Sequence, residues 1–115
     1  NFYADHQIGL SEGTALAAAQ EAVALAPTNG LAYDALGRIE QAMNAYSAAM
    51  NAFIQAANFA PTNALIHVHL GNIEASLGYL RSAELNLHKA IVLDFNGPTA
   101  RQARQLLQEL PSLGV

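Results

Sequence analysis

Four histidines and nine acidic residues are the side chains of this chain best suited to metal binding or proton transfer. His67 and His69 are two positions apart, and residues at that spacing on a helix point to roughly opposite sides, so they cannot chelate one ion together. A zinc site needs three or four converging ligands, and the chain has no cysteine to supply thiolates. We therefore predict no metal site, and we interpret His67 as a partly buried packing residue.

Two glutamates, Glu40 and Glu74, occupy matching places 34 residues apart. One interpretation is structural, with each carboxylate partly exposed or bonded to the end of a neighbouring helix. The alternative is a functional pair of acidic ligands, since a buried carboxylate without a partner is costly. Both interpretations remain open at the level of sequence.

Motifs for catalysis or cofactor binding are absent from the sequence. The glycines are isolated, and neither a GxGxxG nor a GxxxxGK[S/T] string occurs. No serine stands in the G-x-S-x-G context of a nucleophile elbow. We predict that the chain is not an enzyme and that it needs no cofactor.

Composition excludes two further classes of function. The formal net charge is -4 and the five Lys and Arg residues are scattered, whereas a nucleic-acid-binding face needs clustered basic residues. No uninterrupted apolar stretch of about 18 residues is present, so no membrane span is expected. The compartment stays unknown, with the cytoplasm slightly favoured. Because the chain starts at Asn1 and not at methionine, we expect it to be a piece of a longer or processed protein.

An internal period of 34 residues organises the sequence, and such a period indicates a repeat architecture. Pro27 is followed by Pro61, and the pair Leu36-Gly37 is followed by Leu70-Gly71. Further matches at the same spacing are Leu31 with Leu65, Ile39 with Ile73, Phe53 with Leu87, and the series Ala15, Ala49, Ala83 and Ala22, Ala56, Ala90.

Each unit is predicted to hold two helices. The expected helices are residues 30–43, 45–59, 62 or 63 to 77, and 80–93. Asn63 or Thr62 can cap a helix by accepting bonds from its first free N–H groups. Gly78 and Asn44 are the residues expected to end the first helix of each unit, because glycine and asparagine adopt the left-handed conformation most readily.

Small residues indicate where these helices pack closely. A glycine inside a helix costs about 1 kcal/mol relative to alanine, so its presence suggests the close approach of another backbone. We predict that Gly37 faces Ala49 on the second helix of its unit, with the same contact in the next unit. Phe53 and Leu87 are expected to fill the gap between units.

These landmarks resemble the tetratricopeptide repeat (TPR), which carries an aromatic, Leu-Gly, Ala, a large apolar residue, Ala and Pro at this spacing. The matching residues are Tyr33, Leu36, Gly37, Ala49, Phe53, Ala56 and Pro61 in one unit, and Leu70, Gly71, Gly78, Ala83, Leu87, Ala90 and Asp94 in the next. The sequence departs from the family with His67 for the aromatic, Phe95 for the proline, and Glu40 and Glu74 where tyrosine is usual.

The resemblance implies an all-α fold, an α-solenoid of antiparallel helix pairs in a right-handed superhelix. We expect one TPR domain over residues 1–115, with a partial repeat at 1–29, repeats at 30–63 and 64–97, and a capping helix at 98–110. The partial repeat would have only a stub, Asn1–Ile8, for its first helix, followed by an Ala-rich helix over residues 12–26. The last helix has an apolar stripe and a polar back, as terminal caps of repeat arrays require, and Pro98 suits its first position.

The resemblance also implies a function, because first helices of successive TPR units line a concave groove that binds protein partners. The predicted groove residues are Leu31, Asp34, Arg38, Gln41, Leu65, Val68, His69, Asn72 and Ser76. Asp34 and Arg38 are four apart and are expected to pair with each other on one helix face. Asn72 matches a place where the family often has an Asn that bonds to the ligand backbone. The groove lacks the several cations that bind a peptide's terminal carboxylate in chaperone-binding relatives, so we predict an extended or helical ligand with apolar anchors.

Two other functions stay open. Without a full first helix in the first unit, the surface Ala15–Val23 would expose an apolar side, and exposed apolar patches mark association sites. The chain is then a homo-oligomerising assembly module that acts through its end faces. A regulatory domain fused to an enzyme or transporter is the third class.

Overall fold

The computed structural model describes the backbone of residues 2–111 and the side chains of residues 13–111. The described part consists of six α-helices and contains no strand. The helices are α1 (Phe2–Leu25), α2 (Gly30–Ala42), α3 (Tyr46–Phe59), α4 (Ala64–Ser76), α5 (Leu80–Leu93) and α6 (Pro98–Glu109).

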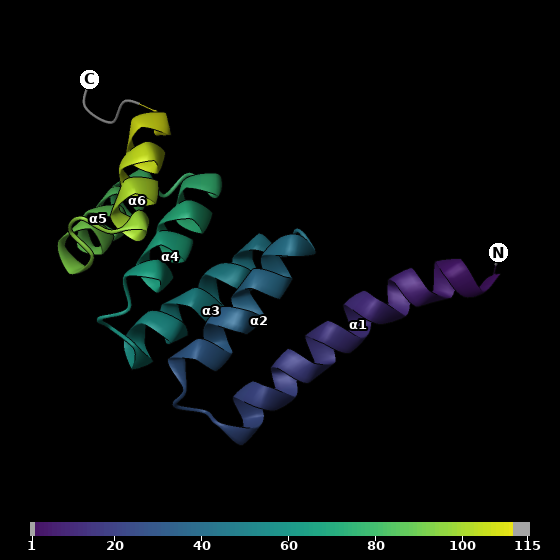
Figure 1. Cartoon of the computed structure of the whole chain (residues 1–115). Coiled ribbons are helices and arrows are strands. Elements are labelled where there is room, and N and C mark those ends of the chain that lie inside the picture. Colours follow the sequence, from purple (N-terminus) through teal and green to yellow (C-terminus); the bar gives the residue numbers. More distant parts are fainter. Residues whose placement is uncertain (1, 112–115) are drawn as a thin grey trace.

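The helices stack in chain order (Figure 1). The pairs α2/α3 and α4/α5 are helical hairpins, and α3 packs against α4 to join them. At the C-terminal end α6 packs against α5 and α4, whereas at the other end α1 packs against α2 alone and extends away from the stack. Each helix therefore contacts its neighbours in the chain, as expected for a helical-repeat fold.

The ends of the central helices lie where the sequence predicts them, within two residues. Asn29 and Asn63 are the N-cap residues, and each side-chain oxygen accepts hydrogen bonds from backbone N–H groups of the first turn. Asn44 and Gly78 have φ angles of 64° and 88°, so both adopt the left-handed conformation that was predicted to end the first helix of each unit.

The nearest neighbour of the glycine in each Leu-Gly pair is the large apolar residue of the second helix. A Cβ atom built on Gly37 would lie 2.6 Å from the ring of Phe53, and one on Gly71 would lie 2.9 Å from Cγ of Leu87. For Gly37 the nearest atoms thus belong to Phe53 and not to the predicted Ala49, whereas for Gly71 the carbonyl oxygen of the predicted Ala83 is also close, 3.2 Å from the built Cβ. The absent side chain makes room for the large residue one helical turn further along.

Phe53 also contacts the next unit, as predicted. Together with Ala49 it forms a fully buried cluster with Leu70 and Ile73 of α4. In the next layer Leu87 and Ala90 form a cluster with Ala103 of α6. The core is therefore a series of small clusters between successive helices, which positions α2, α4 and α6 side by side.

The first helix differs from the sequence expectation. Instead of a stub over Asn1–Ile8 followed by a separate helix, α1 is continuous from Phe2 to Leu25. The intervening residues include no proline, and one glycine costs only about 1 kcal/mol in a helix, which does not force a break. Among the described residues no helix is both long enough and apolar enough to cross a membrane.

Candidate functional site

A charged cluster joins α2 to α4 on the face where the groove is predicted. Oδ1 of Asp34 lies 2.7 Å from Nδ1 of His69, and its Oδ2 lies 3.1 Å from Nε of Arg38. The predicted Asp34–Arg38 pair is thus confirmed. The imidazole of His69 also packs on Phe53, with ring centroids 5.5 Å apart. His69 and Asp34 therefore fix the orientation of the two first helices, while Arg38 remains largely exposed.

The nine predicted groove residues differ in accessibility. The side chains of Leu31, Leu65, Arg38 and Ser76 are exposed, those of Gln41, His69 and Asn72 are half-buried, and those of Asp34 and Val68 are buried. Val68 is 1% exposed and belongs to the core cluster with Leu87 and Ala103. The prediction that Val68 contacts a partner was therefore wrong, because α4 is rotated so that this position faces α5 and α6.

Asn72 and Ser76 lie beside the last helix. They line a pocket of about 230 Å³ together with Leu106, Glu109 and Leu110 of the α6 end. The hydroxyl of Ser76 donates to the carbonyl oxygen of Asn72 at 3.2 Å, so the free group here is the Asn72 amide. The contribution of α6 was not predicted, because its apolar stripe is accounted for by internal packing alone.

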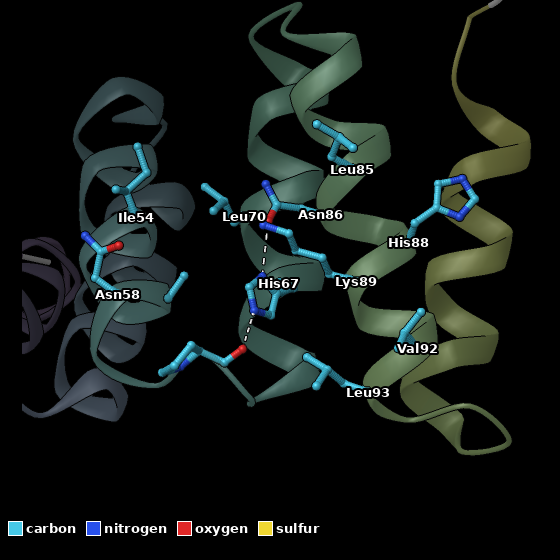
Figure 2. Close-up of a pocket in the computed structure, with 12 residues that line it drawn as sticks. Ile54, Asn58, His67, Leu70, Leu85, Asn86, His88, Lys89, Val92 and Leu93 are labelled. Atoms are coloured by element: carbon cyan, nitrogen blue, oxygen red, sulfur yellow. Dashed lines mark hydrogen bonds between the residues drawn. The ribbon is translucent and has the colours of Figure 1, made fainter.

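A larger hollow of about 780 Å³ lies between α3 and α5, with α4 as its floor (Figure 2). We call it the α3/α5 valley; its walls include Ile54, Leu70, Leu85, Lys89, Val92 and Leu93. This valley was not predicted from the sequence. The available signal was the spacing of Leu85 and Val92, which are seven apart on one face of a helix whose other faces are packed.

His67 lies on the floor of this valley and is held by two hydrogen bonds, drawn as dashed lines in Figure 2. Its Nε2–H donates to the carbonyl oxygen of Pro61 at 2.8 Å, and its Nδ1 lies 3.1 Å from Oδ1 of Asn86. The Asn86 amide nitrogen donates to Oε1 of Glu74 at 2.8 Å and to the carbonyl oxygen of Ser82 at 3.2 Å. His67, Asn86 and Glu74 are all buried.

This arrangement determines which atoms donate. A backbone carbonyl only accepts hydrogen bonds, so the bond to Ser82 keeps the NH₂ end of Asn86 on that side and its Oδ1 toward His67. The second ring nitrogen of His67, Nδ1, faces this Oδ1. Asn86 thus lies between His67 and the carboxyl group of Glu74 and contacts both.

The two glutamates have different environments. Burial raises the pKa of Glu74, while the hydrogen bond from Asn86 and the positive charge of Lys89 act in the opposite direction. Burial also raises the pKa of Glu40, whose Oε1 is buried without a hydrogen-bond partner. The position equivalent to Asn86 in the first unit is Ala52, which explains why Glu40 has no amide donor.

These features agree with the structural interpretation for Glu74, which is bonded to the next helix. No hydrogen bond joins Glu74 to Glu40, and the described residues contain no group of three or more His, Asp or Glu side chains placed to hold a metal ion.

No protein-family model and no curated protein sequence matches the chain. Solved structures do match. Two structures of the Yersinia enterocolitica type III secretion translocator chaperone SycD, one described as an alternative dimer, have TM-scores of 0.80 and 0.79 at 22% identity. They cover 93% of this chain and 76% and 83% of theirs. The TPR domain of Arabidopsis OM64 has a TM-score of 0.75 at 21% identity, covering 88% of this chain and 84% of that one. The structural neighbours thus include a TPR domain and a secretion chaperone, and they support a helical-repeat fold.

Proposed function

We propose that this chain is a protein-interaction scaffold that binds a segment of a partner protein in a groove formed by α2, α4 and α6. The observation that carries the proposal is the Asp34–His69 contact, which fixes two successive first helices side by side and leaves Arg38, Leu31 and Leu65 exposed. The neighbouring TPR domain and secretion chaperone, both protein-interaction modules, support the same class of function.

The proposed architecture is one α-solenoid domain over residues 1–115 whose last helix is a cap. Ala100 and Ala103 of α6 are fully buried against the preceding unit. The opposite side of α6 carries Arg101, Gln102, Arg104 and Gln105, all exposed, and a polar outer face is what the terminal element of a repeat array needs for solubility.

The proposed mechanism is recognition by a surface that is ordered before the partner arrives. Leu31 is 61% exposed and Leu65 is 42% exposed, and they would serve as apolar anchors for the partner. The amide of Asn72 would bond to the partner backbone beside the small pocket formed with α6. Because the Asp34–His69 contact already orders the two first helices, little conformational entropy of the backbone is lost on binding.

A photo-crosslinking residue at position 31 tests this proposal in extracts of the source cells. We expect one partner to be crosslinked from position 31, and none from position 102, an exposed residue on the outer side of α6 that serves as the control. Arg38→Ala or Asn72→Ala should then weaken capture, whereas Arg81→Ala, an exposed cation on α5, should not. Equal capture by all of these variants would reject the groove.

A homo-oligomerising assembly module is the second candidate. The favouring observation is the exposed apolar side of α1, where Ala15, Ala18 and Ala22 are exposed and Leu25 is 78% exposed. The neighbour described as an alternative dimer points in the same direction. Light scattering coupled to size exclusion over a hundredfold concentration range separates the candidates, since the groove binder is a 12.1 kDa monomer throughout. A dimer that Ala18→Glu converts to monomer would establish assembly through α1 instead.

A further inference from the structure

The α3/α5 valley is a surface with the size and chemistry of a binding site, and the proposed groove does not use it. Its volume of about 780 Å³ lies within the roughly 300–1,000 Å³ usual for ligand sites. The valley is formed by second helices, whereas the proposed groove is formed by first helices. The two surfaces can therefore be occupied, and tested, independently.

The walls of the valley are apolar and exposed. Leu85 is 63% exposed, Val92 is 77% exposed and Leu93 is 41% exposed, all on one side of α5. Ile54 of α3 forms the opposite wall, and Leu70 contributes to the floor. Contiguous exposed apolar side chains next to a hollow mark an interaction site more often than isolated ones do.

The charge of the valley opposes that of the rest of the chain. The chain has a net charge of -4, yet no Asp or Glu lines the valley. Lys89 extends from α5 into the hollow (Figure 2), and His88 also contributes to its lining. Lys89 forms no salt bridge among the described residues. The carboxyl group of Glu74 is buried and accepts a hydrogen bond from Asn86, so it does not line the valley.

We propose that the α3/α5 valley is a second docking surface, which binds an amphipathic partner segment with large apolar side chains and carboxylates. The apolar side chains of the segment pack between Ile54 and the exposed side of α5. A carboxylate of the segment pairs with Lys89, and α3, which carries no charged residue, offers no competing anion or cation. Opposite charges at the rim select the acidic partner and disfavour a basic one.

Two synthetic peptides test the proposal against the whole chain. One is an acetylated peptide of about 14 residues of Leu and Glu with Leu at helical i, i+3 and i+4 spacing, and the other replaces each Glu with Lys. Binding is followed through amide shifts of the ¹⁵N-labelled chain. We expect the Leu/Glu peptide to bind at least about tenfold more tightly than the Leu/Lys peptide, with shifts confined to residues 54–58 and 85–93.

Single substitutions show where the peptide binds and distinguish the valley from the groove. Val92→Glu, at a largely exposed position, should weaken binding of the Leu/Glu peptide at least about tenfold. Lys89→Gln should reduce the ratio between the affinities for the Leu/Glu and the Leu/Lys peptides. Leu31→Glu, a matched change on α2, should alter neither result. The thermal unfolding of each variant shows whether the fold is intact.

Three outcomes would overturn the proposal. The first is a set of amide shifts centred on α2 and α4, which would place the acidic peptide in the groove. The second is equal binding of the two peptides. The third is a wild-type chain that self-associates and becomes monomeric on Val92→Glu, because a second copy of the chain would then be the occupant of the valley.

Discussion

Asn86→Ala is the change that tests most directly the buried polar bridge between α4 and α5. It removes the acceptor that lies 3.1 Å from Nδ1 of His67 and the donor that lies 2.8 Å from Oε1 of Glu74. His67 and Glu74 are both buried, and each would lose the hydrogen-bond partner that Asn86 supplies from α5. The bridge therefore stabilises the second repeat.

The expected cost follows from the two orphaned groups. Leaving a buried polar group unsatisfied costs about 1–3 kcal/mol, so two such groups cost about 2–6 kcal/mol. His67 and Asn86 line the α3/α5 valley, from which water can enter and replace part of the lost bonding. We therefore expect a loss of about 2–4 kcal/mol, or roughly 8–20 °C in Tm for a chain of this size.

Urea unfolding followed by circular dichroism at 222 nm measures this loss by linear extrapolation. The control is Asn51→Ala, an exposed asparagine of α3, which should change the unfolding free energy by less than about 0.5 kcal/mol. A loss for Asn86→Ala no larger than that of the control would refute the reasoning, because the two buried groups would then need no partner.

Three further predictions concern single residues. Gly37→Ala should destabilise the fold by about 1–3 kcal/mol, because the new Cβ would lie 2.6 Å from the Phe53 ring. Gly13→Ala, whose new Cβ would have nothing within 4 Å, should stabilise the fold by about 0.5–1 kcal/mol. Urea unfolding of both variants measures the two changes, and a Gly37→Ala variant as stable as wild type would contradict the close contact. Gly78→Ala should cost about 1–2 kcal/mol in the same assay, because φ is 88° and alanine is strained there, and an unchanged midpoint would contradict the left-handed cap. The pKa of Glu40 is raised by burial above its ordinary 4.5, so the stability it contributes is fully present below that pH and is lost as the pH rises through the raised value. Glu40→Gln should therefore stabilise the fold progressively more, relative to wild type, between pH 4 and pH 7, and a constant difference over that range would contradict the assignment.

The positions of the helices could be predicted from sequence because the signals are local. Asn63 caps its helix through its own side chain, and Gly78 ends one through its own backbone, so neither needs tertiary information. The 34-residue period then transferred the same predictions from one unit to the next. The continuous α1 was the one helix predicted wrongly. The first unit contains no cap or proline that would force a break within it.

The site was harder to predict because it depends on helix rotation and on contacts between units. Val68 was assigned to the groove from its place in the repeat, but α4 turns that side chain into the core. The bond between Asp34 and His69 joins residues 35 apart on different helices, and no spacing rule predicts it. The bridge from His67 to Glu74 likewise depends on Asn86, which has no equivalent in the first unit.

The α3/α5 valley could not be predicted from the sequence for a different reason. Leu85 and Val92 were available in the sequence, but apolar residues on a repeat helix are expected to be buried by the neighbouring unit. In this chain the backbones of α3 and α5 do not approach each other closely, and Leu85 and Val92 stay exposed. The exposure follows from the spacing of the stacked units, which sequence does not reveal.

The central claim is that the first helices bind a partner protein while the chain itself stays monomeric. The most direct test is the calorimetric affinity of the partner segment crosslinked from position 31, measured with wild type, with the Arg38→Ala/Asn72→Ala double variant and with Arg81→Ala. We predict affinity at least about tenfold weaker for the double variant, a loss of roughly 1.4 kcal/mol or more, and no change for Arg81→Ala. Equal affinity for all three proteins would contradict the claim.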